Sequence, residues 1–180
     1  MRAALNAIGY QIASLVVIQS AGTERPWRGI AACILFIALQ WGFSQSRPGD
    51  ARAMACALLV AWVLDGTWSA TGWVQHASPE PALIAPLWIT ALWLAFAMTF
   101  NHSMRWLQGR PWLAAILGAI GGPLAYWTAG RVFSAVVLPS PSWPSLLMLA
   151  IGWAMAIPLI AWAAGSGAAT LLDTRKGART

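Results

Sequence analysis

The chain has 180 residues and a formal net charge of +6 at pH 7, and 59% of its residues are hydrophobic while only 9% are charged. Together with a mean hydropathy of +0.63, this composition excludes an ordinary soluble domain and indicates a membrane protein. Membrane topology accounts for the excess of arginine and lysine, so no nucleic-acid partner is expected.

Apolar windows fill almost the whole chain. A spanning helix needs roughly 20 mostly apolar residues, and six such windows follow one another with short polar breaks between them. We therefore predict an all-α polytopic membrane protein that forms a single domain over residues 1–180, with six transmembrane helices in one bundle. The approximate predicted spans are 3–19, 27–43, 51–74, 83–107, 112–138 and 143–165.

The distribution of basic residues predicts the orientation. With six spans both termini lie on one side of the membrane, and that side collects most of the basic residues, whereas the other side has only Arg25, Arg28 and Arg131. The positive-inside rule then predicts that both termini are cytoplasmic. The residues on the terminal side are Arg2, Arg47, Arg52, Arg105, Arg110, Arg175, Lys176 and Arg179.

The first window starts after Arg2, as a signal peptide would, but Asn6, Gly9 and Gln11 interrupt its apolar run. We therefore expect a first helix that is retained. Asn6, Tyr10 and Gln11 mark one polar side of this helix.

The third window carries Asp65 near its middle. At helical spacing Asp65, Ser69, Gly72 and His76 would form one stripe. A carboxyl group at this depth must be protonated or satisfied by hydrogen bonds inside the bundle. A polar clamp between helices is the favoured interpretation, and a functional carboxylate is the alternative.

The fourth window ends in the polar stretch with the most informative sequence. Asn101, His102 and Ser103 lie about one turn before the apolar segment ends, and Arg105 and Arg110 follow. Polar groups inside a spanning segment are functional candidates. They would either cap the helix end or receive an anionic headgroup or fatty-acid carboxylate at the membrane surface.

The fifth and sixth windows combine small residues with proline. Ala114, Gly118 and Gly122 repeat at intervals of four, a pattern that lets two membrane helices approach closely. Pro123 and Pro158 each remove one helix hydrogen bond, so a break is expected at Gly122–Pro123 and another at Pro158. Two kinked and well-packed helices are favoured over a cavity-lining pair.

Counting residues along the predicted helices sorts the polar groups into two layers. The central layer consists of Asp65, Ser69, Tyr126 and an indole. The layer near the cytoplasmic surface, which holds the candidate ligand-binding residues, consists of Asn6, Gln11, Asn101, His102 and Arg105.

Neither a metal site nor a disulfide is expected. Metal ligands lie about 2 Å from one ion, but His102, His76 and Asp65 are spread over most of the membrane depth. Cys33 and Cys56 are separated in depth by roughly 9 Å, which is too far for a disulfide. No cofactor is predicted, and no catalytic residue is assigned.

Several stretches resemble DUF2878, an uncharacterised family of small bacterial inner-membrane proteins. The resemblance is carried by Leu92–Leu107, with its Asn-His-Ser triplet, and by Leu117–Tyr126, with its Gly-Gly-Pro triplet. Asn6, Gln11, Leu64-Asp65, Gly152-Trp153 and Pro158 are also similar to that family. The resemblance implies a multi-pass protein of the bacterial inner membrane. It also implies frequent gene neighbours that resemble cyclopropane-fatty-acid synthases and flavin-dependent oxidoreductases.

Three functions follow as hypotheses. The first is a lipid- or acyl-binding accessory or anchoring protein for membrane fatty-acid modification, with membrane lipids and cytoplasmic lipid-modifying enzymes as partners. The second is a small proton-coupled transporter that uses Asp65 and the proline-broken helices. The third is an integral-membrane lipid enzyme with His102 as general base.

Overall fold

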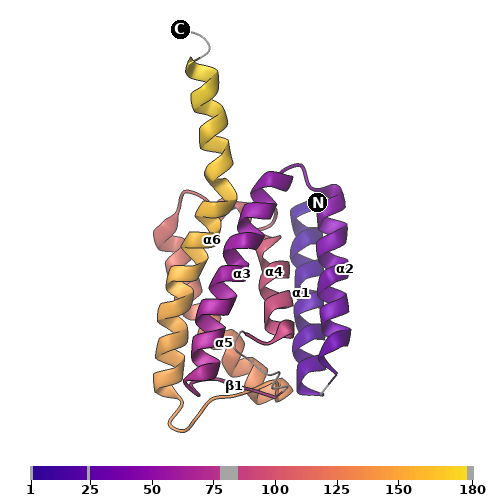
Figure 1. Ribbon diagram of the computed structural model, residues 1–180, viewed down its shortest axis with the longest axis vertical. Helices are drawn as coiled ribbons and strands as arrows, with labels where there is room; N and C mark the ends of the chain where they lie inside the picture. The colour runs from indigo at the N-terminus through magenta and orange to yellow at the C-terminus, as the bar shows by residue number, and fades with distance from the viewer. Residues whose placement is uncertain (1, 24, 78–84, 178–180) are drawn as a thin grey trace.

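The computed structural model describes residues 2–23, 25–77 and 85–177, and side chains as far as residue 166. Over these residues the fold is helical (Figure 1). Its helices are α1 (Arg2–Gly22), α2 (Pro26–Phe43), α3 (Arg47–Ala70), α4 (Leu87–Ala97), the 3₁₀-helix η1 (Arg105–Leu107), α5 (Pro111–Phe133) and α6 (Trp143–Gly177). Two short strands, β1 (Gln75–His76) and β2 (Val136–Val137), pair antiparallel.

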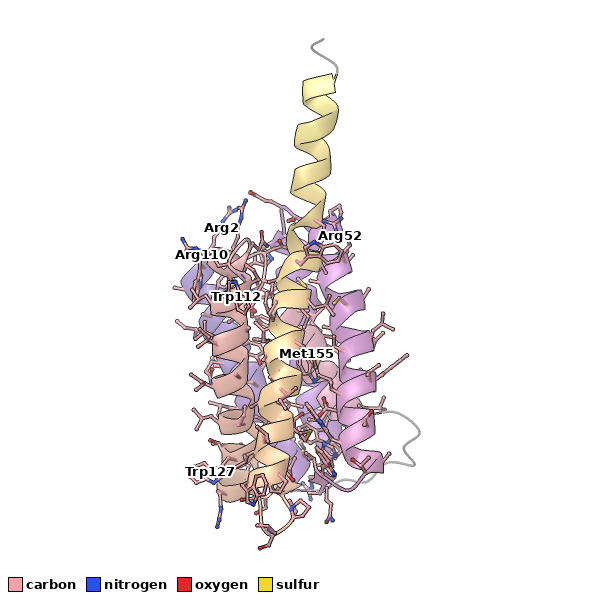
Figure 2. The ribbon with its side chains drawn as sticks, turned by 90° about the vertical axis from the view of Figure 1, so that its left-hand side faces the viewer. Arg2, Arg52, Arg110, Trp112, Trp127 and Met155 are labelled. Atoms are coloured by element: carbon pink, nitrogen blue, oxygen red, sulfur yellow. The ribbon has the colours of Figure 1, made fainter. Side chains whose placement is uncertain are left out.

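Five helices are long and apolar enough to cross a membrane: α1, α2, α3, α5 and the part of α6 from Trp143 to Ser166. Their outward faces carry large apolar side chains such as Met155, which is 61% exposed and projects from the middle of α6 (Figure 2). A soluble bundle would place polar residues on those faces. The chain is therefore a multi-pass helical membrane protein.

The predicted fourth span is wrong in its second half. Helix α4 has 11 residues, a length of about 16 Å, which is well short of the roughly 30 Å of a bilayer core. After Ala97 the amides of Met98 and Thr99 bond to carbonyls three residues back, so the α-helix ends there. The start of the predicted span, residues 83 and 84, lies outside the described residues.

Helix α4 is buried along most of its length. Its buried residues include Trp88, Ile89 and Trp93, and it packs on α1, α2 and α3. A helix that is apolar all round needs such an environment. In Figure 1 it lies between the α1–α2 pair and α3.

Both termini lie at the same end of the bundle (Figure 1). Arg2, Arg52 and Arg110 lie at this end, which we call the terminal end, and Trp127 lies near the opposite end (Figure 2). Helix α6 extends beyond the bundle at the terminal end (Figure 1). The predicted placement of the two termini on one side is therefore found, while their cytoplasmic location stays a prediction.

The predicted stripe on the third span ends early. Helix α3 stops at Ala70, and Gly72, whose φ of +74° is unfavourable for other residues, follows in a turn. His76 lies in β1 instead of on the helix. Of the stripe, only Asp65 and Ser69 therefore share a helix face.

Small residues join α5 to α6. A Cβ atom on Gly118 would lie 2.2 Å from the carbonyl oxygen of Trp153, and one on Gly122 would lie 2.2 Å from Cγ of the same residue. The predicted close approach at these glycines is therefore present. Both helices continue through their prolines, Pro123 and Pro158.

The first prediction concerns this contact. Gly122→Ala should lower the free energy of unfolding by about 1–3 kcal/mol, because the added methyl group forces the two helices apart. Gly121→Ala is the matched control, since a Cβ there meets nothing within 4 Å. Thermal denaturation in detergent measures both, and equal midpoints would contradict the packing described.

Candidate functional site

The polar site at the terminal end is built around Asp50, a residue that the sequence patterns did not single out. Its side chain is fully buried in the first turn of α3. It accepts hydrogen bonds from the Ser44 hydroxyl and, at 2.9 Å, from Nδ2 of Asn101. Nε2 of His102 lies 3.4 Å from the same carboxyl group. The positive end of the helix dipole also favours a carboxylate there.

Asn6 connects the first two helices to the segment after α4. Its Nδ2 donates to Oε1 of Gln40 at 2.9 Å and to the carbonyl of Met98 at 3.2 Å. Its Oδ1 accepts from the hydroxyl of Ser103 at 2.7 Å. The buried amide of Asn6 is therefore used inside the protein, and it stabilises the site rather than lining its cavity.

Gln108 stabilises the same segment from its other end. Its Nε2 donates to the carbonyl of Phe100 and to Oδ1 of Asn101, both at 2.9 Å. The side chains of Asn6, Asp50 and Gln108 thus form hydrogen bonds with residues 98–103, which follow α4 and are not helical. The polar stretch Asn101-His102-Ser103 was the signal for this arrangement, but its partners Asn6 and Asp50 come from distant parts of the chain.

A cavity of about 910 Å³ opens at this network. The guanidinium-bearing residues Arg2, Arg52 and Arg105 line it together with Asn101 and His102. Nε of Arg52 donates to the carbonyl of Ala163 at 3.1 Å, which fixes this side chain against α6. The structure therefore brings together three of the five predicted ligand-binding residues, namely Asn101, His102 and Arg105.

Gln11 lies elsewhere. It is exposed on α1 and lines a second cavity of about 310 Å³ between α1, α4 and α5. The cavity at the terminal end does not include it. The predicted surface layer is therefore divided between an arginine-lined cavity and a groove at mid-helix.

The central site joins three helices through one carboxyl group. Asp65 of α3 is fully buried. It accepts hydrogen bonds from the hydroxyl of Tyr126 on α5 and, at 2.8 Å, from Nε1 of Trp93 on α4. The Trp93 ring stacks on Trp153 of α6 with 4.3 Å between ring centroids. Asp65 and Tyr126 therefore meet, with Trp93 as the indole, whereas no hydrogen bond joins Ser69 to this group among the described residues.

His76 lies near the end opposite His102, outside the helices that could span the membrane. Its ring packs edge-on against Trp88, with 5.7 Å between centroids. Burial lowers the pKa of His76 to about 4, because the charged imidazolium would lose its hydration there. The ring is therefore neutral at physiological pH.

The arrangement at the terminal end suits binding of an anion better than acyl transfer. Ser103 donates its hydroxyl to Asn6, so it is not paired with His102 as a nucleophile would be. The arginines instead present several donors in the planar geometry that matches phosphate and carboxylate groups.

A comparison with known protein families finds one match. The family model described as "Protein of unknown function (DUF2878)" matches residues 3–159. No curated protein and no solved structure matches the chain. The matched range contains Asn6, Asp50, Asp65, His102 and Tyr126, so both polar networks fall within it.

The second prediction tests the central site. Tyr126→Phe removes one of the two donors to Asp65 and should lower the free energy of unfolding by about 1–3 kcal/mol. Trp127→Phe, at the exposed neighbouring position on the same helix, is the control. Unfolding by a denaturing detergent, followed by circular dichroism, measures both, and a control as destabilised as Tyr126→Phe would count against the clamp.

The third prediction follows from the neutral His76. An unfolded histidine has a pKa of about 6.5, so between that value and about 4 the unfolded chain binds more protons. Stability should therefore fall with decreasing pH in this window, by up to about 1.4 kcal/mol per pH unit from this residue. His76→Phe should flatten the dependence measured by thermal denaturation. An unchanged slope in the variant would contradict this assignment.

Proposed function

This chain belongs to DUF2878, a family of unknown function, and we propose from the geometry of its arginine-lined cavity that it binds an anionic lipid headgroup at the membrane surface. The binding residues would be Arg52, Arg105 and His102, with Asp50 orienting the imidazole and Asn101 lining the cavity beside it. In the cell the protein would act as an accessory or anchoring partner for enzymes that modify membrane fatty acids.

The observation that supports this proposal is the charge around the cavity. Arg2, Arg52 and Arg105 line it, while Asp50, the carboxylate of this site among the described side chains, is fully buried and already bonded to Ser44 and Asn101. A net positive, water-accessible cavity remains. Phosphate and carboxylate groups of lipids are the anions available at a membrane surface.

The proposed orientation places this cavity on the cytoplasmic side of a bacterial inner membrane. Arg2, Arg52 and Arg110 lie at the terminal end (Figure 2). Arg105 lines the cavity with Arg2 and Arg52, and Arg47 begins the same helix as Arg52. Cytoplasmic loops are enriched in arginine and lysine. Anionic lipids of the inner leaflet would then reach the cavity directly. A soluble lipid-modifying enzyme could dock on the same basic surface.

The central carboxyl group supports a structural role over proton coupling. Both oxygens of Asp65 accept hydrogen bonds, from Tyr126 and from Trp93. A coupling carboxylate in a transporter has to gain and lose a proton along an accessible path. In our proposal Asp65 instead holds α3, α4 and α5 together.

A second candidate function is an integral-membrane lipid enzyme with His102 as general base. The contact of His102 with Asp50, at 3.4 Å between Nε2 and Oδ2, favours it, because a carboxylate orients a catalytic imidazole in many enzymes. Conversion of a bound lipid by the purified protein without any partner, lost in His102→Ala, would establish this alternative.

The fourth prediction tests headgroup binding. The double variant Arg52→Gln, Arg105→Gln should bind phosphatidylglycerol about thirtyfold more weakly than the unmodified protein, since each arginine near a membrane surface contributes about 1 kcal/mol. Native mass spectrometry of the detergent-purified protein, titrated with phosphatidylglycerol and with phosphatidylcholine, measures the two affinities. Binding to phosphatidylcholine should be weak and should change little.

The matched control is Arg25→Gln, Arg131→Gln, which removes the same charge from the other end of the bundle. Competition with inorganic phosphate distinguishes a lipid site from a site for any soluble anion. A lipid site should retain phosphatidylglycerol at phosphate concentrations that would displace a soluble anion from the same cavity. Equal weakening by both double variants would show that overall charge is responsible and would refute the cavity.

A further inference from the structure

The groove between α1 and α5 is a separate site with its own chemistry. It is lined on α1 by residues from Tyr10 to Ile18, a distance of about 12 Å along the helix, and on α5 by residues from Gly121 to Phe133. Helix α4 forms its floor through Trp88, Ile89, Leu92, Trp93 and Phe96. Helices α1 and α5 make few contacts with each other, so a gap remains between them. The groove lies in this gap and runs along the membrane-spanning helices.

The shape favours a single hydrocarbon chain. The groove is long and narrow, because its volume of about 310 Å³ is distributed over a length of about 12 Å. A helix from a second protein, which is about 10 Å wide with its side chains, would not enter it. Lipid chains run along the same direction as the groove and surround it in the membrane.

Three polar side chains in the groove walls have hydrogen-bond partners within the protein. The hydroxyl of Tyr126 and Nε1 of Trp93 both donate to Asp65, and the hydroxyl of Ser14 donates to the backbone carbonyl of Gln11. Aromatic rings, including Phe96 and Trp153, make up much of the remaining wall. These surfaces favour apolar contacts without selecting among lipid chains.

Gln11 differs from the other polar groups of the groove in its exposure. Nε1 of Trp88 and Nε1 of Trp153 also lack a partner among the described residues, but both atoms are buried. The Gln11 side chain is exposed in the groove, and its amide forms no hydrogen bond with any described residue. It lies near the middle of α1, about 14 Å along the helix from Arg2, at the depth of the hydrocarbon core. An amide without a partner at this depth is unfavourable, so a ligand that provides one gains affinity.

We propose that this groove binds one hydrocarbon chain of a lipid, and that Gln11 selects a chain with an oxygen function, a hydroxyl or carbonyl, near its middle. The Gln11 amide both donates and accepts, so it pairs with either group. A plain alkyl chain fills the same groove but leaves the amide without a partner. The preference for an oxygenated chain is therefore the signature of the site.

The experiment uses uncharged ligands, so that the arginine-lined cavity makes no contribution. Methyl ricinoleate and methyl oleate differ only by one mid-chain hydroxyl group. The two esters compete for the detergent-purified protein, and native mass spectrometry measures how much of each is bound. Methyl ricinoleate should bind about three- to tenfold more tightly than methyl oleate, because one hydrogen bond between membrane helices contributes a free energy of that size. The methyl esters of α-hydroxystearic and stearic acid should bind equally, because their hydroxyl lies at the wrong depth.

Two variants decide the assignment. Gln11→Leu should abolish the preference for methyl ricinoleate while methyl oleate still binds. Gln19→Leu alters an exposed glutamine two turns along the same helix, outside the groove, and should keep the preference. Equal binding of the two esters by the unmodified protein would overturn the proposal. So would a preference that survives Gln11→Leu, or a dimer that Gln11→Leu converts to a monomer.

Discussion

Hydrogen bonds that a bilayer cannot supply are the constraint on which this structure depends. Water satisfies exposed polar groups in soluble proteins, but inside hydrocarbon every amide, carbonyl and carboxyl group needs a partner within the protein. The short helix α4 illustrates the constraint. The chain leaves helical geometry after Ala97, and side chains of Asn6, Asp50 and Gln108 provide hydrogen-bond partners for the segment that follows.

The two polar networks use this constraint differently. At the centre, Asp65 is enclosed, and its two donors connect α3, α4 and α5. At the terminal end, Asp50 is equally buried, but its partners Asn101 and His102 also line an open cavity with arginines around it. One network therefore connects helices inside the bundle, and the other positions side chains toward an open cavity. The proposed headgroup site depends on this difference in exposure.

The groove at Gln11 is a third place where hydrogen bonding inside the bilayer matters. Here the polar group lacks a partner within the described protein, and the missing hydrogen bond is the basis of the selectivity that we propose. The groove is lined by α1, α4 and α5 at mid-helix. Arg2 and Arg52, which line the other cavity, lie at the terminal end (Figure 2), and the two cavities share no lining residue. Headgroup and chain chemistry can thus be tested separately.

Composition and local pattern were sufficient for the helical membrane class, the family and the close contact at Gly118 and Gly122, because hydropathy and small-residue spacing act over short stretches of chain. The pattern also placed Asp65 and Tyr126 at one depth. It failed where long-range contacts override local preference: the apolar run after Leu87 continues past Ala97, but Asn6 and Asp50, distant in the chain, stabilise a non-helical segment there. No sequence pattern distinguishes Asp50, because it lies next to a polar turn, where acidic residues are common. Its burial, and the separation of Gln11 from His102, depend on how the helices are arranged around α4, since residue spacing along one helix gives depth but not which neighbour a side chain faces.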